Sequence, residues 1–154
     1  LLTVVSGLVA GITINFVFAI GEEIGWRGYL YSELKRLGFW KMTIATGAIW
    51  GIWHAPLVLQ GHNYPEYPVL GVLMMTIWCI LLSPLFSFVR MKSKSVLTAG
   101  IAHGTLNGLA GASILYIVGG HALLNGIIGL SGFIALLIVN IVIWMKIGKE
   151  PVDF

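Results

Sequence analysis

The sequence predicts an all-α integral membrane protein, a bundle of about five transmembrane helices around a central polar site. Of its 154 residues, 58% are hydrophobic and 10% are charged, and the mean hydropathy is +0.94. A soluble domain is about half apolar and about a quarter charged, so this composition indicates a membrane protein. The apolar residues run on without the alternation that β-barrel strands show, and helices are therefore expected.

The length of the apolar stretches and the residues that interrupt them place each span. In order along the chain, the predicted spans are Leu2–Ile24, Met42–Leu59, Val69–Val89, Val96–Val118 and Leu123–Met145. After the first span, Trp26, Tyr29 and Tyr31 precede a mixture of charged and apolar residues, which predicts that this helix continues as an amphipathic segment along the interface. Residues 1–154 are expected to form one domain, and the start at Leu1 is the reason to expect part of a longer multi-pass protein.

The basic residues of the connections predict a topology. They follow the first, third and fifth spans, at Lys35, Arg36, Lys41, Arg90, Lys92, Lys94, Lys146 and Lys149. By the positive-inside rule these connections are cytoplasmic, so the chain is expected to begin outside the cell membrane and end inside it. The net charge of +3 then reflects orientation in the lipid bilayer, and no nucleic-acid partner is expected.

Ionisable groups are costly in hydrocarbon, so polar residues inside or beside the apolar stretches are candidate site residues. They are Glu22, Glu23, Arg27, His54, His103 and Asn107. Adjacent glutamates on a helix point about 100° apart, so Glu22 and Glu23 are expected to have different roles. Arg27 lies four residues after Glu23, at the spacing of a helical ion pair. Glu22 is left to act with a group from another helix, as a general base near neutral pH with His54 beside it.

His103 and Asn107 share a helix face because they are four residues apart, and two such donors suit a developing oxyanion. Depth supports a single site, because Glu22, His54 and Asn107 each lie 13 residues, roughly 20 Å along a helix, from a basic residue of a cytoplasmic connection. The alternative is that these side chains only form hydrogen bonds between helices, or that Glu23 and Arg27 are a structural pair.

Three motifs therefore carry the candidate site. They are Glu22-Glu23-Ile24-Gly25-Trp26-Arg27, Trp50-Gly51-Ile52-Trp53-His54 and His103-Gly104-Thr105-Leu106-Asn107. Together they resemble the CAAX prenyl protease and bacteriocin-processing (CPBP, or Abi) family of intramembrane endopeptidases. The sequence departs from the family pattern only at Trp50, where phenylalanine is usual.

The resemblance implies a membrane-bound hydrolase, a glutamate-dependent endopeptidase without a covalent intermediate. Glu22 with His54 would activate a water molecule, and the two glutamates could exchange roles. His103 and Asn107 would hold the oxyanion, and the ion pair of Glu23 would support the site. The implied substrate is a membrane-anchored peptide or protein, either prenylated and CAAX-like or a bacteriocin or leader sequence, which reaches the site from the cytoplasmic side.

No cofactor is expected, although two histidines and a glutamate could also hold zinc with a water in the fourth position. The sequence has no His-Glu-x-x-His helix. The alternatives are a zinc-dependent intramembrane metalloprotease and a non-enzymatic protein for bacteriocin self-immunity or membrane scaffolding. A transporter is disfavoured because the outer halves of the predicted spans are almost purely apolar.

Overall fold

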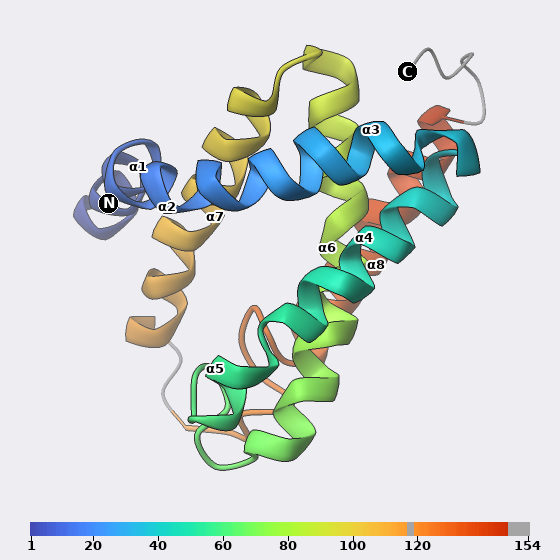
Figure 1. Cartoon of the computed structure of the whole chain (residues 1–154). Coiled ribbons are helices and arrows are strands. Elements are labelled where there is room, and N and C mark those ends of the chain that lie inside the picture. Colours follow the sequence, from blue (N-terminus) through green and yellow to red (C-terminus); the bar gives the residue numbers. More distant parts are fainter. Residues whose placement is uncertain (117–118, 148–154) are drawn as a thin grey trace. The chain divides into compact units, whose positions relative to one another are not determined.

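The computed structural model describes residues 1–116 and 119–147, and every regular element within these ranges is a helix (Figure 1). The helices are α1 (Leu2–Ile12), α2 (Ile14–Glu23), η1 (Ile24–Leu30), α3 (Tyr31–Leu34), η2 (Lys35–Leu37), α4 (Phe39–Trp53), α5 (Ala55–Leu59), α6 (Pro68–Ser93), α7 (Val96–Tyr116) and α8 (Leu130–Ile147). The predicted fold class, an all-α membrane protein, is confirmed.

Fewer helices than predicted are long and apolar enough to cross a membrane. In the part of the chain that the structure describes, three qualify, at Phe39–Leu59, Pro68–Ser93 and Leu130–Ile147, and the bent pair of α1 with Ile14–Leu37 makes a fourth if it is one span. The predicted span Val96–Val118 forms α7 as far as Tyr116, and Val118 lies outside the described residues. This helix is not among the spans because its glycines, His103 and Asn107 lower its mean hydropathy.

One predicted span is bent, and the predicted start of another was wrong. The first span does not run straight from Leu2 to Ile24, because the helix breaks at Thr13, where φ is −114° and ψ is −97°, and bends by 46°. The Thr13 hydroxyl donates to the Val9 carbonyl at 2.6 Å, a local bond that competes with regular helix. The last span begins at Leu130 rather than Leu123, because residues 121–129 form turns in which Gly126 takes a φ of +82°.

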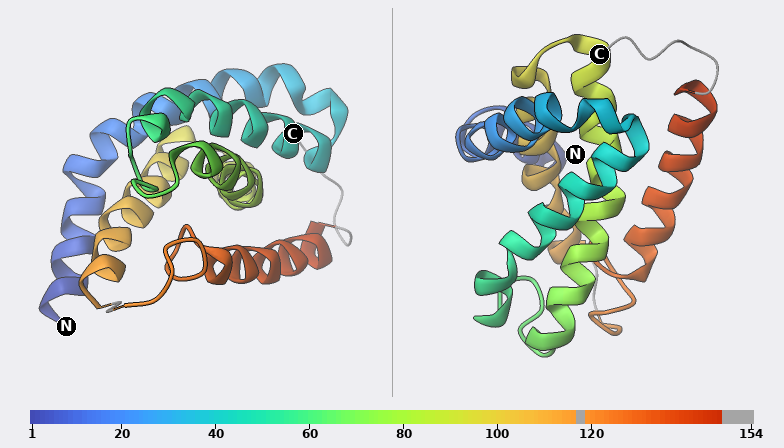
Figure 2. Two further views of the ribbon diagram at one scale, coloured as in Figure 1. Left: turned by 90° about the horizontal axis from the view of Figure 1, so that it is seen from below. Right: turned by 45° about the vertical axis from the view of Figure 1, so that its right-hand side comes forward.

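The chain divides into two compact units. Unit 1 comprises Leu1–Glu33 and Phe86–Gly119, and unit 2 comprises Leu34–Leu85 and the segment from Gly120 onward. In unit 1, α1 and α2 pack along α7, and the blue and orange ribbons lie side by side in both views of Figure 2.

Glycines make the contact of α1 with α7 a close one. A Cβ atom on Gly108 would overlap the carbonyl oxygen of Gly7, and one on Gly104 would overlap that of Gly11. Small residues at this spacing let the backbones of membrane helices approach each other closely. The packing predicts that side chains larger than hydrogen are excluded at these positions, which fixes the register of α7 against α1.

Unit 2 is built on α6. Gly47 of α4 packs against the backbone of α6, where a Cβ atom would lie 2.6 Å from Ile80 Cα. The Trp78 indole donates to the Ile127 carbonyl at 2.9 Å, and the Tyr64 hydroxyl donates to the Ile128 carbonyl at 2.7 Å. Burial raises the pKa of the Tyr64 phenol, which therefore remains a donor over the physiological range.

Candidate active site

Glu23 is the centre of a buried polar network in unit 1. It is the last residue of α2, and its side chain is fully buried. The Arg27 Nη1 donates to the Glu23 Oε1 at 3.0 Å, and neither side chain is exposed. The ion pair expected from the spacing of these two residues is confirmed.

His103 of α7 joins the same carboxylate oxygen. Its Nδ1 lies 2.8 Å from the Glu23 Oε1, so this oxygen accepts from both a guanidinium and an imidazole. A proton on Nδ1 makes Nε2 an acceptor when the imidazole is neutral and a donor when it is protonated. The sequence placed Asn107 at the depth of Glu22, with His103 one helical turn away, but it did not indicate which glutamate His103 contacts.

Phe86 of α6 provides an aromatic surface for the network. Its ring stacks on the His103 imidazole, with centroids 5.1 Å apart and an angle of 23° between the planes. The Arg27 Cζ lies 5.2 Å from the centroid of the same ring. Phe86 is 1% exposed, so the guanidinium and the imidazole lie against an aromatic face in a water-poor environment.

The segment that carries Arg27 is a π-helix. It spans Ile24–Leu30, directly after the two glutamates. A π-helical turn has an i→i+5 hydrogen-bond pattern and is often found at functional sites. Gly25 and Gly28 lie in this segment, and residues without a Cβ adopt unusual helical geometry at a low steric cost. The sequence pattern did not predict this change of helix type.

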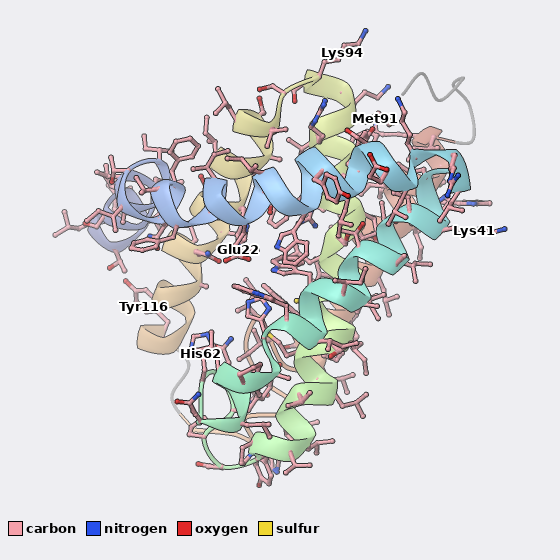
Figure 3. The ribbon with its side chains drawn as sticks, viewed as in Figure 1. Glu22, Lys41, His62, Met91, Lys94 and Tyr116 are labelled. Carbon is pink, nitrogen blue, oxygen red and sulfur yellow. The ribbon has the colours of Figure 1, made fainter. Side chains whose placement is uncertain are left out.

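Glu22 has surroundings unlike those of Glu23, as predicted. It is half-buried, and the Trp26 Nε1 lies 3.4 Å from its Oε2. Figure 3 labels its side chain at the end of α2. Of the two glutamates, Glu22 is therefore the more accessible, whereas Glu23 is enclosed by Arg27 and His103.

Asn107 lies one turn after His103 on α7 and is exposed. The two residues are on the same face of the helix, as predicted from their spacing. Asn107 is outside the buried group formed by Glu23, Arg27 and His103. Its part in holding an oxyanion stays a prediction.

His54 belongs to unit 2, at the break between α4 and α5, and is 9% exposed. Its Nδ1 donates to the Trp50 carbonyl at 2.9 Å, and its ring makes an edge contact with Trp53 at 4.9 Å. The bond to the carbonyl selects the neutral tautomer in which Nε2 carries the lone pair, the form needed in a base. Trp50 thus holds His54 through its backbone carbonyl, and its indole ring also contacts the imidazole, with centroids 5.8 Å apart. That His54 and Glu22 act together on a water molecule stays a prediction.

Neither unit contains, within its described residues, a group of three or more His, Cys, Asp or Glu side chains that could hold a metal ion. In unit 1 the Glu23 Oε1 already accepts from two side chains. The dependence on zinc therefore stays a matter for experiment.

The helices and the buried carboxylate–imidazole pair define a class, the multi-pass membrane proteins with a polar centre inside the helices. Residues 4–109 match the family described as type II CAAX prenyl endopeptidase Rce1-like, and the match contains all six candidate residues. The chain belongs to this family, which confirms the resemblance seen in its motifs.

A protein named CAAX prenyl protease 2, from Methanococcus maripaludis, is 30% identical over 96 residues. The match covers 56% of this chain and 34% of that relative, so the chain spans about a third of the relative's length. No solved structure matches the chain.

Proposed function

We propose that the chain forms the catalytic part of a membrane endopeptidase that hydrolyses a peptide bond in a membrane-anchored protein. The observation that carries the proposal is the buried group of Glu23, Arg27 and His103, since charged side chains inside a membrane protein mark functional sites. Membership of the endopeptidase family and the named CAAX prenyl protease support the choice of reaction.

Glu22 is the proposed general base. It is half-buried and more accessible than Glu23, so its carboxylate can accept a proton from water. His54 is proposed to orient this water through Nε2, because its Nδ1 is held by the Trp50 carbonyl, and then to relay to the leaving amine the proton that Glu22 has taken from the water. The water then attacks the peptide carbonyl carbon, and the bond to the amine breaks after the amine is protonated.

His103 and Asn107 are proposed to stabilise the oxyanion. The Nδ1 of His103 is directed to Glu23, so the ring would meet the oxyanion with Nε2, which donates only when the imidazole is protonated. Glu23 is therefore proposed to orient His103 through this bond, and Arg27 to hold Glu23 in place.

The mechanism is proposed to use no metal and no nucleophilic side chain. Arg27 and His103 share the Glu23 Oε1, which leaves this carboxylate poorly suited to a metal ligand. Ser6, Ser83, Ser113 and Cys79 have no base at helical spacing, whereas water needs only Glu22 and His54. The substrate is proposed to be a prenylated CAAX-like or leader-like segment that approaches from the cytoplasmic side.

The test is cleavage of a fluorogenic prenylated CAAX peptide by the detergent-purified protein. Loss of a general base typically costs about 100- to 10,000-fold, so kcat/KM of Glu22→Gln is expected to fall by that factor. Glu33→Gln, which changes an exposed carboxylate of α3, is the matched control and is expected to match wild type.

Each result of this experiment decides something. Activity that survives a zinc chelator and disappears in Glu22→Gln supports the proposed mechanism. Loss of activity on chelation that zinc restores would establish a metalloprotease instead. A wild-type protein that cleaves no prenylated or leader peptide would favour the non-enzymatic immunity or scaffold function.

A further inference from the structure

We propose that Phe86 and Arg90 of α6 are positioning residues that hold the buried network of Glu23, Arg27 and His103 in its working geometry. These two residues are called the α6 clamp below. Neither residue belongs to the three sequence motifs. From the sequence, Arg90 is expected only to help orient the chain in the membrane. The kinetic part of the inference rests on the proposed peptidase function.

The first half of the α6 clamp acts on His103. The imidazole is tied to Glu23 at Nδ1 by a bond of 2.8 Å. A single hydrogen bond sets a distance but lets the ring turn about the bond, so it does not fix the direction of Nε2. The stacked ring of Phe86, 5.1 Å away and inclined by 23°, fixes the plane of the imidazole. Phe86 therefore determines where Nε2 points.

The same ring lies against Arg27. The guanidinium Cζ is 5.2 Å from the Phe86 centroid, and its Nη1 donates to Glu23. Both side chains that donate to the Glu23 Oε1 thus lie on one aromatic residue. The negative face of an aromatic ring attracts cations, which suits a guanidinium and a protonated imidazole.

The second half of the α6 clamp acts on the backbone that carries Arg27. Arg90 lies four residues after Phe86, on the same face of α6. Its Nε donates to the Arg27 carbonyl at 3.3 Å, and its Cζ lies 5.3 Å from the ring of Tyr31. Arg27 is in the π-helix and Tyr31 begins the α-helix that follows, so Arg90 is anchored on both sides of the point where the hydrogen-bond pattern changes.

The network needs an outside support of this kind. The Glu23 Oε1 accepts two bonds, but the Glu23 Oε2 is buried and has no hydrogen-bond partner among the described residues. The carboxylate is therefore held at one oxygen only, and its orientation depends on what holds Arg27 and His103. A displacement of about 1 Å in a catalytic group can cost about 100-fold in rate, so small losses of support are expected to be visible in kcat.

The kinetic test compares two phenylalanines of one helix. In Phe86→Leu, kcat is expected to fall at least about tenfold, while KM stays within about twofold, because orientation in the transition state is lost and substrate binding is not. Phe88→Leu is the matched control, since Phe88 lies two residues away on another face and its ring neighbours Lys92 rather than the network. Equal kcat in the two variants would overturn the role of Phe86.

Arg90→Lys distinguishes a positioning role of Arg90 from a role in membrane orientation alone. Lysine keeps the positive charge, so a residue that only orients the chain in the membrane would tolerate the change completely. Lysine has no Nε–H in a planar group to bond the Arg27 carbonyl while stacking on Tyr31. The expected result is a reduced kcat with unchanged KM, and wild-type kinetics in Arg90→Lys would remove Arg90 from the proposal.

A spectroscopic measurement keeps the test independent of peptidase activity. In protein labelled with ¹⁵N-histidine, the His103 signals are assigned by their absence in His103→Gln. Phe86→Leu is expected to shift these signals, and Phe88→Leu is expected to leave them unchanged. The spectra of both variants are recorded at a temperature at which both proteins are folded. Unchanged His103 signals in Phe86→Leu would refute the clamp, even if the wild type hydrolyses no peptide and the proposed function fails.

Discussion

At the scale of a residue, the contacts of Glu23 show what sequence spacing can predict and what it cannot. The ion pair with Arg27 follows from the sequence, because an i,i+4 relation is local and survives any tertiary arrangement. The bond to His103 does not follow, since the two residues are 80 positions apart and their contact depends on the packing of α2 against α7. The same holds for Phe86, which is one apolar residue among many in the sequence and becomes distinctive only through its contacts.

A buried ion pair costs stability when one partner is removed. Glu23→Gln leaves the Arg27 charge buried without its counter-charge, and the free energy of unfolding is expected to fall by about 3 to 5 kcal/mol. The double variant Glu23→Gln/Arg27→Met removes both charges and is expected to recover most of this loss. Thermal or denaturant unfolding in detergent measures the difference.

Glu33→Gln serves as the control for this prediction too, because an exposed charge contributes at most about 1 kcal/mol. A Glu23→Gln protein as stable as the control would show that Arg27 finds another counter-charge. Failure of the double variant to recover would show that the hydrogen bonds, rather than the charges, carry the stability.

Hydropathy predicted most elements but not their breaks. The helices α4, α6 and α8 coincide in large part with predicted spans, because the need to bury a long apolar stretch dominates their sequence. The break at Thr13 and the π-helix at Ile24–Leu30 depend on the hydrogen bonds of a few backbone groups. Averaging over about 20 residues, the length of a span, conceals such local features.

The seam between α1 and α7 predicts a difference between two glycines of one helix. A Cβ atom at Gly108 would overlap the Gly7 carbonyl, whereas one at Gly111 would meet nothing within 4 Å. Gly108→Ala is therefore expected to lower the free energy of unfolding by about 1 to 3 kcal/mol through overpacking. Gly111→Ala is expected to be neutral or slightly stabilising, because alanine is the better helix former by up to about 1 kcal/mol.

Unfolding of the two variants in the same detergent decides this prediction. Equal stability of Gly108→Ala and Gly111→Ala would mean that α1 and α7 separate in solution without cost. A loss of stability in Gly111→Ala alone would show that α1 packs against the face of α7 that carries Gly111, and not against the face that carries Gly108.

Orientation in the membrane is a property of the whole molecule. Lys92 and Lys94 lie near the turn from α6 to α7, and Figure 3 shows Lys94 extending from the ribbon there. By the positive-inside rule this turn is expected to be cytoplasmic, and the turn that contains His62, between α5 and α6, is expected to be external.

Single cysteines in a Cys79→Ala background test this orientation. Ser93→Cys and His62→Cys both replace exposed residues, so an impermeant maleimide can reach each of them. In intact cells, labelling is expected at His62→Cys only, and in inverted vesicles at Ser93→Cys only. The opposite labelling pattern would show that the chain has the reverse orientation and that the site is reached from the external side.

The distance in sequence between Glu23 and His103 has a consequence for biosynthesis. A ribosome adds about 5 to 20 residues per second, so the 80 residues that separate the two take about 4 to 16 s to make. During that interval Glu23 has been made and its imidazole partner does not yet exist. Arg27 is made within a second of Glu23 at such rates and lies one turn away, so it can neutralise the carboxylate from the outset. We therefore expect the salt bridge to lower the cost of placing Glu23 in the membrane before α7 has been made.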